Sequence, residues 1–127
     1  MEAYSTNIEK ETLENDNYRK VLFTGEKEQL VVMSLKSGED IPMEIHNGID
    51  QFIRIESGSA YVKAGDKEFN LNKDDVVIIP SGTHHYVKNT GEGDLKLYSI
   101  YATPEHKPGT IHKTMQEAVE AHEKEEH

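Results

Sequence analysis

Short runs rich in β-branched and aromatic residues, separated by turn residues, fill the chain from about Tyr18 to Thr103. Glycine or proline closes most of these runs, as at Asn47-Gly48 and at Pro80. The runs cover residues 20–25, 29–38, 43–48, 51–58, 59–66, 67–75, 76–80, 84–91 and 94–102. Eight or nine short strands at this spacing predict an all-β domain, either a sandwich or a closed barrel.

A chain of 127 residues has room for one hydrophobic core. We expect residues 1–17 to be an acidic, solvated arm, residues 18–103 to be the barrel, and residues 104–127 to be a C-terminal loop and helix. Thr114, followed three residues later by Glu117, forms the sequence pattern of a capping box. This pattern predicts a short helix at the end of the chain, docked on the barrel because it is too short to be stable alone.

Composition and charge exclude several classes of function. The formal net charge of −10 argues against nucleic-acid binding, which needs clustered Lys and Arg. No apolar run approaches the roughly 20 residues of a membrane span, and the polar start of the chain predicts a cytoplasmic location. The chain has no cysteine, so disulfides, thiolate metal sites and cysteine nucleophiles are all excluded.

Four polar residues are expected to point into this otherwise apolar barrel. Glu44 and His46 are two residues apart and share a strand face, Gln51 can face the same interior, and His85 is in a later strand. Burying such groups without a partner costs roughly 2–7 kcal/mol each, and a divalent cation would partner all of them at once. Two histidines and a carboxylate are typical of non-haem Fe(II), and Mn, Ni, Co or Zn would also accept them. We therefore predict one divalent metal ion per chain.

Other roles for these four residues remain open at the level of the sequence. His46 and His85 could be hydrogen-bonded barrel histidines without a metal. Gln51 is either a fourth ligand through its amide oxygen or a group that orients Glu44 or a bound water. Glu44 could instead be a general base beside a site of three ligands. No catalytic residue is assigned.

The remaining histidines and tyrosines have less defined expectations. Three histidines are expected on the outer surface or in the solvated tail: His84, His122 and His127. His106 and His112 lie in a proline-containing segment that is either an exposed loop or a lid over the metal pocket. Tyr98 and Tyr101 fall on opposite faces of the last strand, so one of them should line the pocket.

The segments around these candidate ligands resemble the paired motifs of the cupin superfamily. The first cupin motif runs Gly, five residues, His-x-His, three or four residues, Glu, six residues, Gly, and the second runs Gly, five residues, Pro-x-Gly, two residues, His, three residues, Asn. The corresponding residues of the first motif are Gly38, Glu44, His46, Gln51 and Gly58. Those of the second are Asp74 in place of Gly, Pro80, Gly82, His85 and Asn89. The resemblance implies a double-stranded β-helix, or jelly-roll, barrel.

The wider sequence is similar to small single-domain bacterial cupins that are often labelled mannose-6-phosphate isomerase-like. Glu44 in place of His and Gln51 in place of Glu form a swap that keeps one carboxylate in the ligand set. The resemblance implies a metal-binding cupin, a metal-dependent enzyme of dioxygenase or isomerase type acting on a small oxygen-containing molecule. The alternatives are a non-catalytic small-ligand-binding or sensor cupin, and a metal-free isomerase or epimerase that uses His and Tyr as acid and base.

A homodimer is expected on two grounds. The resemblance implies it, and a barrel of this size leaves sheet edges that need cover. The strands between residues 20 and 36 are the candidates for pairing with a partner subunit.

Overall fold

A computed structural model of the protein describes residues 1–125, which form ten strands and two helices. The elements are α1 (Ile8–Glu14), β1 (Arg19–Thr24), β2 (Gln29–Leu35), β3 (Asp40–Glu44), β4 (Asp50–Ser57), β5 (Ala60–Ala64), β6 (Lys67–Leu71), β7 (Val76–Ile79), β8 (His85–Asn89), β9 (Leu95–Ala102), β10 (Ile111–His112) and α2 (Met115–Glu125). Nine strands correspond to the nine runs that the sequence predicts, and β10 lies in a segment predicted to be a loop.

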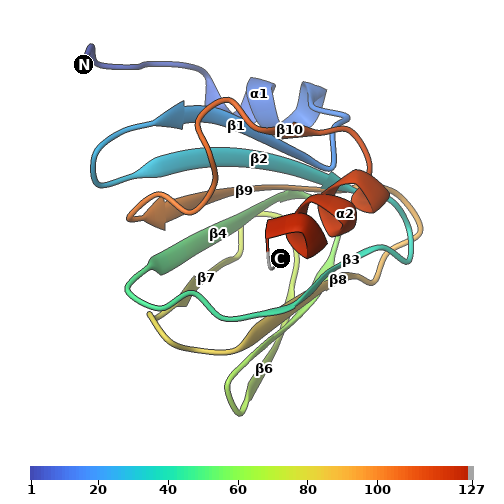
Figure 1. Cartoon of the computed structure of the whole chain (residues 1–127). Helices are drawn as coiled ribbons and strands as arrows, with labels where there is room; N and C mark the ends of the chain where they lie inside the picture. The colour runs from blue at the N-terminus through green and yellow to red at the C-terminus, as the bar shows by residue number, and fades with distance from the viewer. Residues whose placement is uncertain (126–127) are drawn as a thin grey trace.

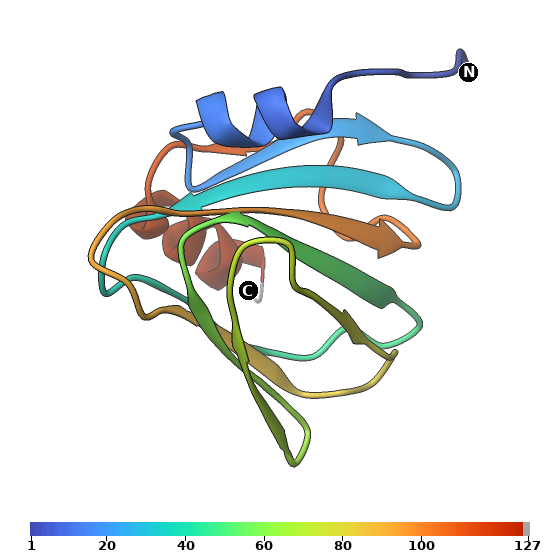
Figure 2. The same cartoon turned by 180° about the vertical axis from the view of Figure 1, so that it is seen from behind.

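The strands form two antiparallel sheets that face each other (Figures 1 and 2). The larger sheet has the order β10-β1-β2-β9-β4-β7, and the smaller has the order β3-β8-β5-β6. This arrangement confirms the predicted jelly-roll barrel with a short C-terminal helix. β2 is bonded on both sides, to β1 and to β9, so it has no free edge for the edge pairing with a partner subunit that the sequence predicts.

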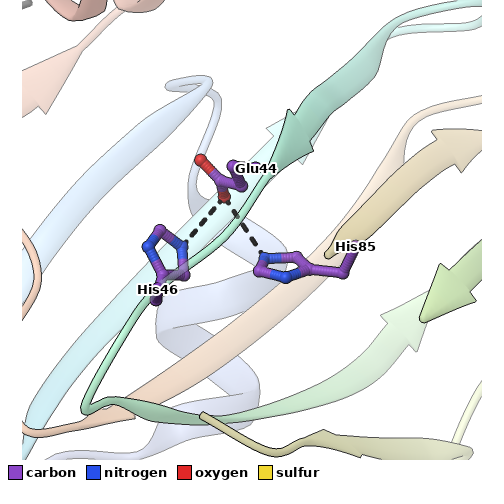
Figure 3. A group of neighbouring side chains, drawn as sticks. All are labelled: Glu44, His46 and His85. Carbon is purple, nitrogen blue, oxygen red and sulfur yellow. Dashed lines mark ion pairs between the residues drawn. The ribbon is translucent and has the colours of Figure 1, made fainter. Parts of the chain in front are cut away.

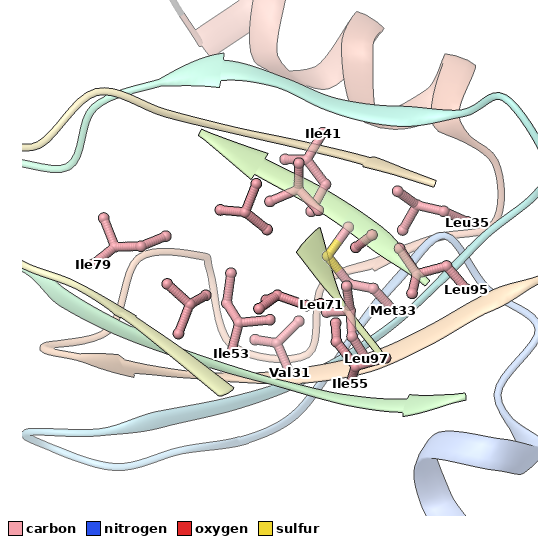
Figure 4. Close-up of a cluster of buried hydrophobic side chains, with 14 of the residues drawn as sticks. Val31, Met33, Leu35, Ile41, Ile53, Ile55, Leu71, Ile79, Leu95 and Leu97 are labelled. Atoms are coloured by element: carbon pink, nitrogen blue, oxygen red, sulfur yellow. The ribbon is translucent and has the colours of Figure 1, made fainter. Parts of the chain in front are cut away.

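Alternating residues of both sheets fill the space between them. Val31, Met33 and Leu35 on β2 are each 0% exposed, and Leu95 and Leu97 on β9 are buried to the same extent. Figure 4 shows these side chains meeting those of the facing sheet. Each fully buried side chain of this size contributes about 1.5–3 kcal/mol through the hydrophobic effect. The polar candidate residues therefore lie in a barrel whose other contents are almost entirely apolar.

Gly58 and Asn89, two residues of the motifs that resemble those of cupins, stabilise turns of the backbone. Gly58 has φ of +92°, and a Cβ built on it would lie 2.9 Å from the carbonyl oxygen of Asp94. The Asn89 side chain donates hydrogen bonds to the carbonyl oxygens of Leu35 and Gly93, at 3.0 and 2.9 Å. Both positions fix turns at one end of the barrel and take no part in its chemistry.

Replacing Gly58 with alanine is expected to lower the free energy of unfolding by about 2 kcal/mol. The positive φ disfavours any side chain there, and the new methyl group would press on the backbone at Asp94. Urea denaturation measures the change. Gly93→Ala is the control, because a Cβ at that position meets no atom within 4 Å. Equal effects of the two substitutions would contradict this account.

The N-terminal segment differs from its prediction as a solvated arm. Residues 8–14 form α1, which contacts the larger sheet at β2, β4 and β9. The Asn7 side chain caps this helix by accepting from the amide of Lys10 at 2.9 Å, and Thr12 is completely buried beneath it. The acidic composition of the segment obscured the helix, since its buried face consists of small and polar residues.

The predicted C-terminal helix is confirmed as α2. The amide of Glu117 donates to Thr114 Oγ1 at 3.1 Å, which is the capping contact that the sequence predicts. Ala118 is buried against the barrel. The prediction for His127 lies outside the described residues. Within residues 1–125, neither helix is long and apolar enough to cross a membrane.

Candidate metal centre

Three donor side chains meet at one end of the barrel, between β3 and β8. Glu44 is the last residue of β3 and is the direct register partner of His85, the first residue of β8. Glu44 Oε1 lies 3.2 Å from His46 Nε2 and 3.6 Å from His85 Nε2 (Figure 3). The two histidines are buried, and the Glu44 side chain is 22% exposed. The predicted grouping of these three residues is therefore present in the fold.

His46 reaches this position by a route that strand alternation does not describe. The sequence predicts a strand over residues 43–48, but β3 ends at Glu44, and the pairing of β3 with β8 is irregular between Ile41 and Glu44. His46 is instead held by the turn after Pro80, where the amide of Gly82 donates to the His46 carbonyl oxygen at 3.0 Å. Gly82 has φ of +78°, a conformation that favours glycine. This glycine of the resembled motif thus orients a candidate ligand.

The Nδ1 atom of each imidazole contacts an oxygen atom that orients the ring. His85 Nδ1 lies 3.0 Å from the carbonyl oxygen of Thr83, which can only accept, so Nδ1 carries the proton. His46 Nδ1 faces Glu105 Oε2 at 3.3 Å. These contacts leave the Nε2 atoms of both imidazoles directed at the centre, and a carboxylate or carbonyl behind a histidine is the usual support of a metal ligand.

The Nε2 atoms of His46 and His85 are buried without a hydrogen-bond partner, in spite of their proximity to Glu44. The amide oxygen of Gln51 is also buried and has no hydrogen-bond partner among the described residues. Each unsatisfied buried group costs about 1–3 kcal/mol. Two imidazole nitrogens and a carboxylate oxygen that converge in this way fit a divalent transition metal ion of borderline softness, which would replace any proton on His46 Nε2.

Charge in this region favours an additional cation. Burial alone would raise the pKa of Glu44, but the close imidazoles of His46 and His85 outweigh it and hold that pKa well below the usual range. Burial would lower the pKa of His46, but its contacts with Glu105 and Glu44 raise it to about 9. Two carboxylates thus flank one imidazole and require positive charge between them. A proton on His46 meets that requirement, and a divalent ion would meet it as well.

Gln51 lies on the inward face of β4, as predicted, and is 3% exposed. Its Nε2 donates to Ser99 Oγ at 3.3 Å, so the amide group is oriented with its oxygen unpartnered. This orientation is compatible with both roles expected from the sequence, a fourth ligand and a group that positions Glu44 or a water.

A cavity of about 740 Å³ opens beside the centre, lined by residues of β1, β3, the segment after β9 and α2. Both His106 and His112 border it, so the segment predicted as either an exposed loop or a lid lies against the site. His84 is exposed, as expected, but also borders the cavity. Of the two tyrosines, Tyr101 is the one beside the centre, with its ring 5.8 Å from that of His46, while Tyr98 packs on Phe52 outside the barrel.

The segment after β9 is attached to the barrel by Gln29, which is 0% exposed. The Gln29 amide oxygen accepts from the backbone amides of Glu105 and His106, at 3.1 and 2.9 Å. Its amide nitrogen donates to the carbonyl oxygen of His106 at 2.7 Å and to Thr24 Oγ1 at 2.9 Å. One buried side chain thus fixes the position of Glu105.

Sequence reasoning missed two residues of this region. Glu105 carries no local signal, because it lies between prolines in a segment without periodicity and reaches His46 only through the tertiary fold. Arg19 is 7% exposed and lines the cavity, yet it looks like an ordinary charged residue at the start of a strand. Its place two residues before Val21, on the strand face that points into the core, was the available signal.

Comparisons with known proteins agree with this architecture. A family model described as a cupin domain matches residues 31–101. The chain is 46% identical over 124 residues to the uncharacterized protein YrkC of Bacillus subtilis, covering 93% of this chain and 67% of that protein. It is 45% identical over 114 residues to an uncharacterized protein of Acanthamoeba polyphaga mimivirus, covering 87% of this chain and 71% of that protein. The crystal structure of BH2720 from Bacillus halodurans matches with a TM-score of 0.92 and 42% identity, over 94% of this chain and 95% of that one.

Proposed function

This chain belongs to the cupin family, and from that premise we propose that it is a metal-dependent enzyme acting on a small oxygen-containing molecule. We infer that Glu44, His46 and His85 hold one divalent ion per chain, with Gln51 as a fourth ligand or a positioning group. The observation that carries the proposal is the convergence of both Nε2 atoms on Glu44 Oε1, with no other hydrogen-bond partner in residues 1–125. When bound, such an ion supplies Lewis acidity toward oxygen atoms of a substrate.

The protein's own groups would orient the ligands and exclude water. The Thr83 carbonyl and the Glu105 carboxylate hold the two imidazoles by their Nδ1 atoms. Tyr101 is 1% exposed and closes one side of the site to water. Charges on that side are less screened than in bulk water.

A tyrosine and a histidine beside the centre are further groups that a bound substrate could contact. His106 Nε2 lies 3.4 Å from the Tyr101 hydroxyl. Burial raises the pKa of Tyr101, so its hydroxyl keeps its proton, and burial together with Arg19 lowers the pKa of His106 to about 4. A neutral imidazole thus lies next to a protonated hydroxyl. Both pKa values lie far from neutrality, so the pair is suited to hydrogen bonding with a substrate oxygen and not to general acid–base catalysis.

Turnover by protein loaded with Fe(II), Mn(II), Ni(II), Co(II) or Zn(II) tests the proposal. Candidate sugars, phenols and keto acids are the substrates, with O₂ consumption followed for the iron form. We expect turnover that depends on the added ion and stops in EDTA. Turnover that survives EDTA would favour the metal-free isomerase. Tight ligand binding without turnover would favour the non-catalytic sensor.

We also propose a homodimer formed through the outer face of the larger sheet. A row of apolar side chains crosses five neighbouring strands there, following the strand register; we call it the outer apolar row. It consists of Phe23, Leu30, Ile100, Phe52 and Ile78. Ile78 is 63% exposed, and Tyr4 stacks on Phe23 at the other end. A continuous apolar row on a sheet face is typical of a protein–protein contact.

Replacing Ile78 with aspartate is expected to convert the dimer to a monomer at micromolar concentration. The charge would be placed at the exposed end of the outer apolar row, where a partner would have to desolvate it. Light scattering measures the mass. Ile111→Asp is the matched control, because Ile111 is 50% exposed and lies on β10, outside the row. A wild-type protein that is already a monomer would count against the dimer.

A further inference from the structure

Arg19 is a buried cation in the wall of the cavity beside the candidate metal centre. It is the first residue of β1, is 7% exposed, and alternates with Lys20 so that its side chain faces inward. The cavity lining includes Arg19 together with the candidate ligands Glu44 and His46. Its positive charge lowers the pKa of Glu44 and of His106, as expected of a guanidinium close to both. The cation and the centre are therefore accessible from the same cavity.

The contacts of Arg19 leave part of its guanidinium unused. Nη1 lies 3.2 Å from His112 Nδ1, and the guanidinium carbon lies 5.4 Å from the centroid of the Tyr18 ring. The Tyr18 hydroxyl donates to the carbonyl oxygen of Asp40, which keeps this ring in place. Nε is buried and has no hydrogen-bond partner, and Arg19 forms no ion pair with any carboxylate of residues 1–124, whose side chains the structure describes.

A buried arginine that no described carboxylate neutralises is unusual, because removing its charge from water is costly unless a partner compensates. The guanidinium is a planar fork of donors that matches a carboxylate in two parallel hydrogen bonds. Arg19 lines the cavity and has no carboxylate partner among the described side chains, so a ligand in the cavity can supply the missing anion.

The surrounding charges select the kind of anion. The cavity also contains the carboxylates of Glu44, Glu105 and Glu123, while Lys107 is the other lysine or arginine among its lining residues. A phosphate dianion would meet strong repulsion from these carboxylates. A carboxylate carries a single negative charge and has the planar shape of the guanidinium fork.

We propose that Arg19 is a substrate-binding residue that recognises the carboxylate of a small carboxylic acid, whose further oxygen atoms lie toward the metal centre. Only the contact between the ligand's further oxygen atoms and the metal centre rests on the proposed function. Recognition by Arg19 itself depends on the cavity and on the unused donors.

Isothermal titration calorimetry of the metal-loaded protein tests this assignment with acetate, pyruvate, lactate, malonate and benzoate. The neutral amide of each acid and inorganic phosphate form the comparison arms. We expect at least one carboxylate to bind and its amide to fail. Arg19→Met should weaken that binding roughly 10- to 100-fold, as loss of hydrogen bonds to a charged group predicts. Arg19→Lys, which keeps the charge and loses the fork, should fall between the two.

Lys20→Met is the matched control and should change the affinity less than about twofold, because Lys20 points away from the cavity. The metal content and the circular-dichroism melting curve of Arg19→Met should match those of the wild type. Carboxylates that bind Arg19→Met as tightly as wild type, or binding by phosphate alone, would overturn the assignment, as would no binding at all. If the wild type holds no metal, the proposed function fails, and the same comparison in the metal-free protein decides the role of Arg19.

Discussion

His85→Ala is expected to reduce bound divalent metal from close to one ion per chain to below roughly a tenth of that value. The substitution removes one of the three donors that converge between β3 and β8, and the remaining pair, Glu44 and His46, leaves two ligands where three or four are usual. Elemental analysis of the protein, purified without chelator and then dialysed against each metal, measures the loss.

The neighbouring histidine provides a matched control. His84→Ala removes the same functional group one residue earlier, from an exposed position, and should leave the metal content unchanged. Glu44→Gln is a second variant that preserves volume, so a folding defect in His85→Ala would not leave the result ambiguous. Metal content that is the same in wild type, His85→Ala and Glu44→Gln would remove the proposed centre.

Glu105→Gln is expected to weaken metal binding roughly 10- to 100-fold while leaving the barrel intact. Glu105 Oε2 lies 3.3 Å from His46 Nδ1, where a carboxylate fixes the orientation of the ring and increases the basicity of Nε2. An amide of the same shape retains part of the orientation but loses the charge. Competition with a chromophoric chelator measures the affinity.

A second glutamate of the cavity separates this contact from the general loss of negative charge. Glu123→Gln makes the same change on α2, at an exposed position that lines the same cavity. Its effect on metal affinity should stay below about twofold. If both substitutions weaken binding equally, the contribution of Glu105 is long-range charge and not support of His46.

The strands and the three central donors could be predicted because their signals are local. Turn residues mark the ends of the strands, and β-branched runs such as Val76–Ile79 mark their interiors. The spacing of Glu44 and His46, and the Pro80 and Gly82 ahead of His85, carried the resemblance that brought distant segments together. Nine strands and the capped helix α2 follow from such signals.

The rest of the site depends on contacts between segments far apart in the sequence, which no local pattern encodes. Glu105 lies 59 residues after His46, and its position depends on the buried side chain of Gln29. Helix α1 was missed for a related reason, since its docking face consists of Thr12 and other residues with weak helical or apolar signals. The early end of β3 is set by its irregular pairing with β8, which the Asn47-Gly48 turn alone does not reveal.

The four hydrogen bonds of Gln29 join the wall of the cavity to the interior of the larger sheet. The backbone at Glu105 therefore stays in place as long as β2 does, and this side of the site behaves as part of the folded barrel. Heating should release the carboxylate and melt the sheet in one cooperative transition, so affinity for the ion would hold until the whole domain unfolds.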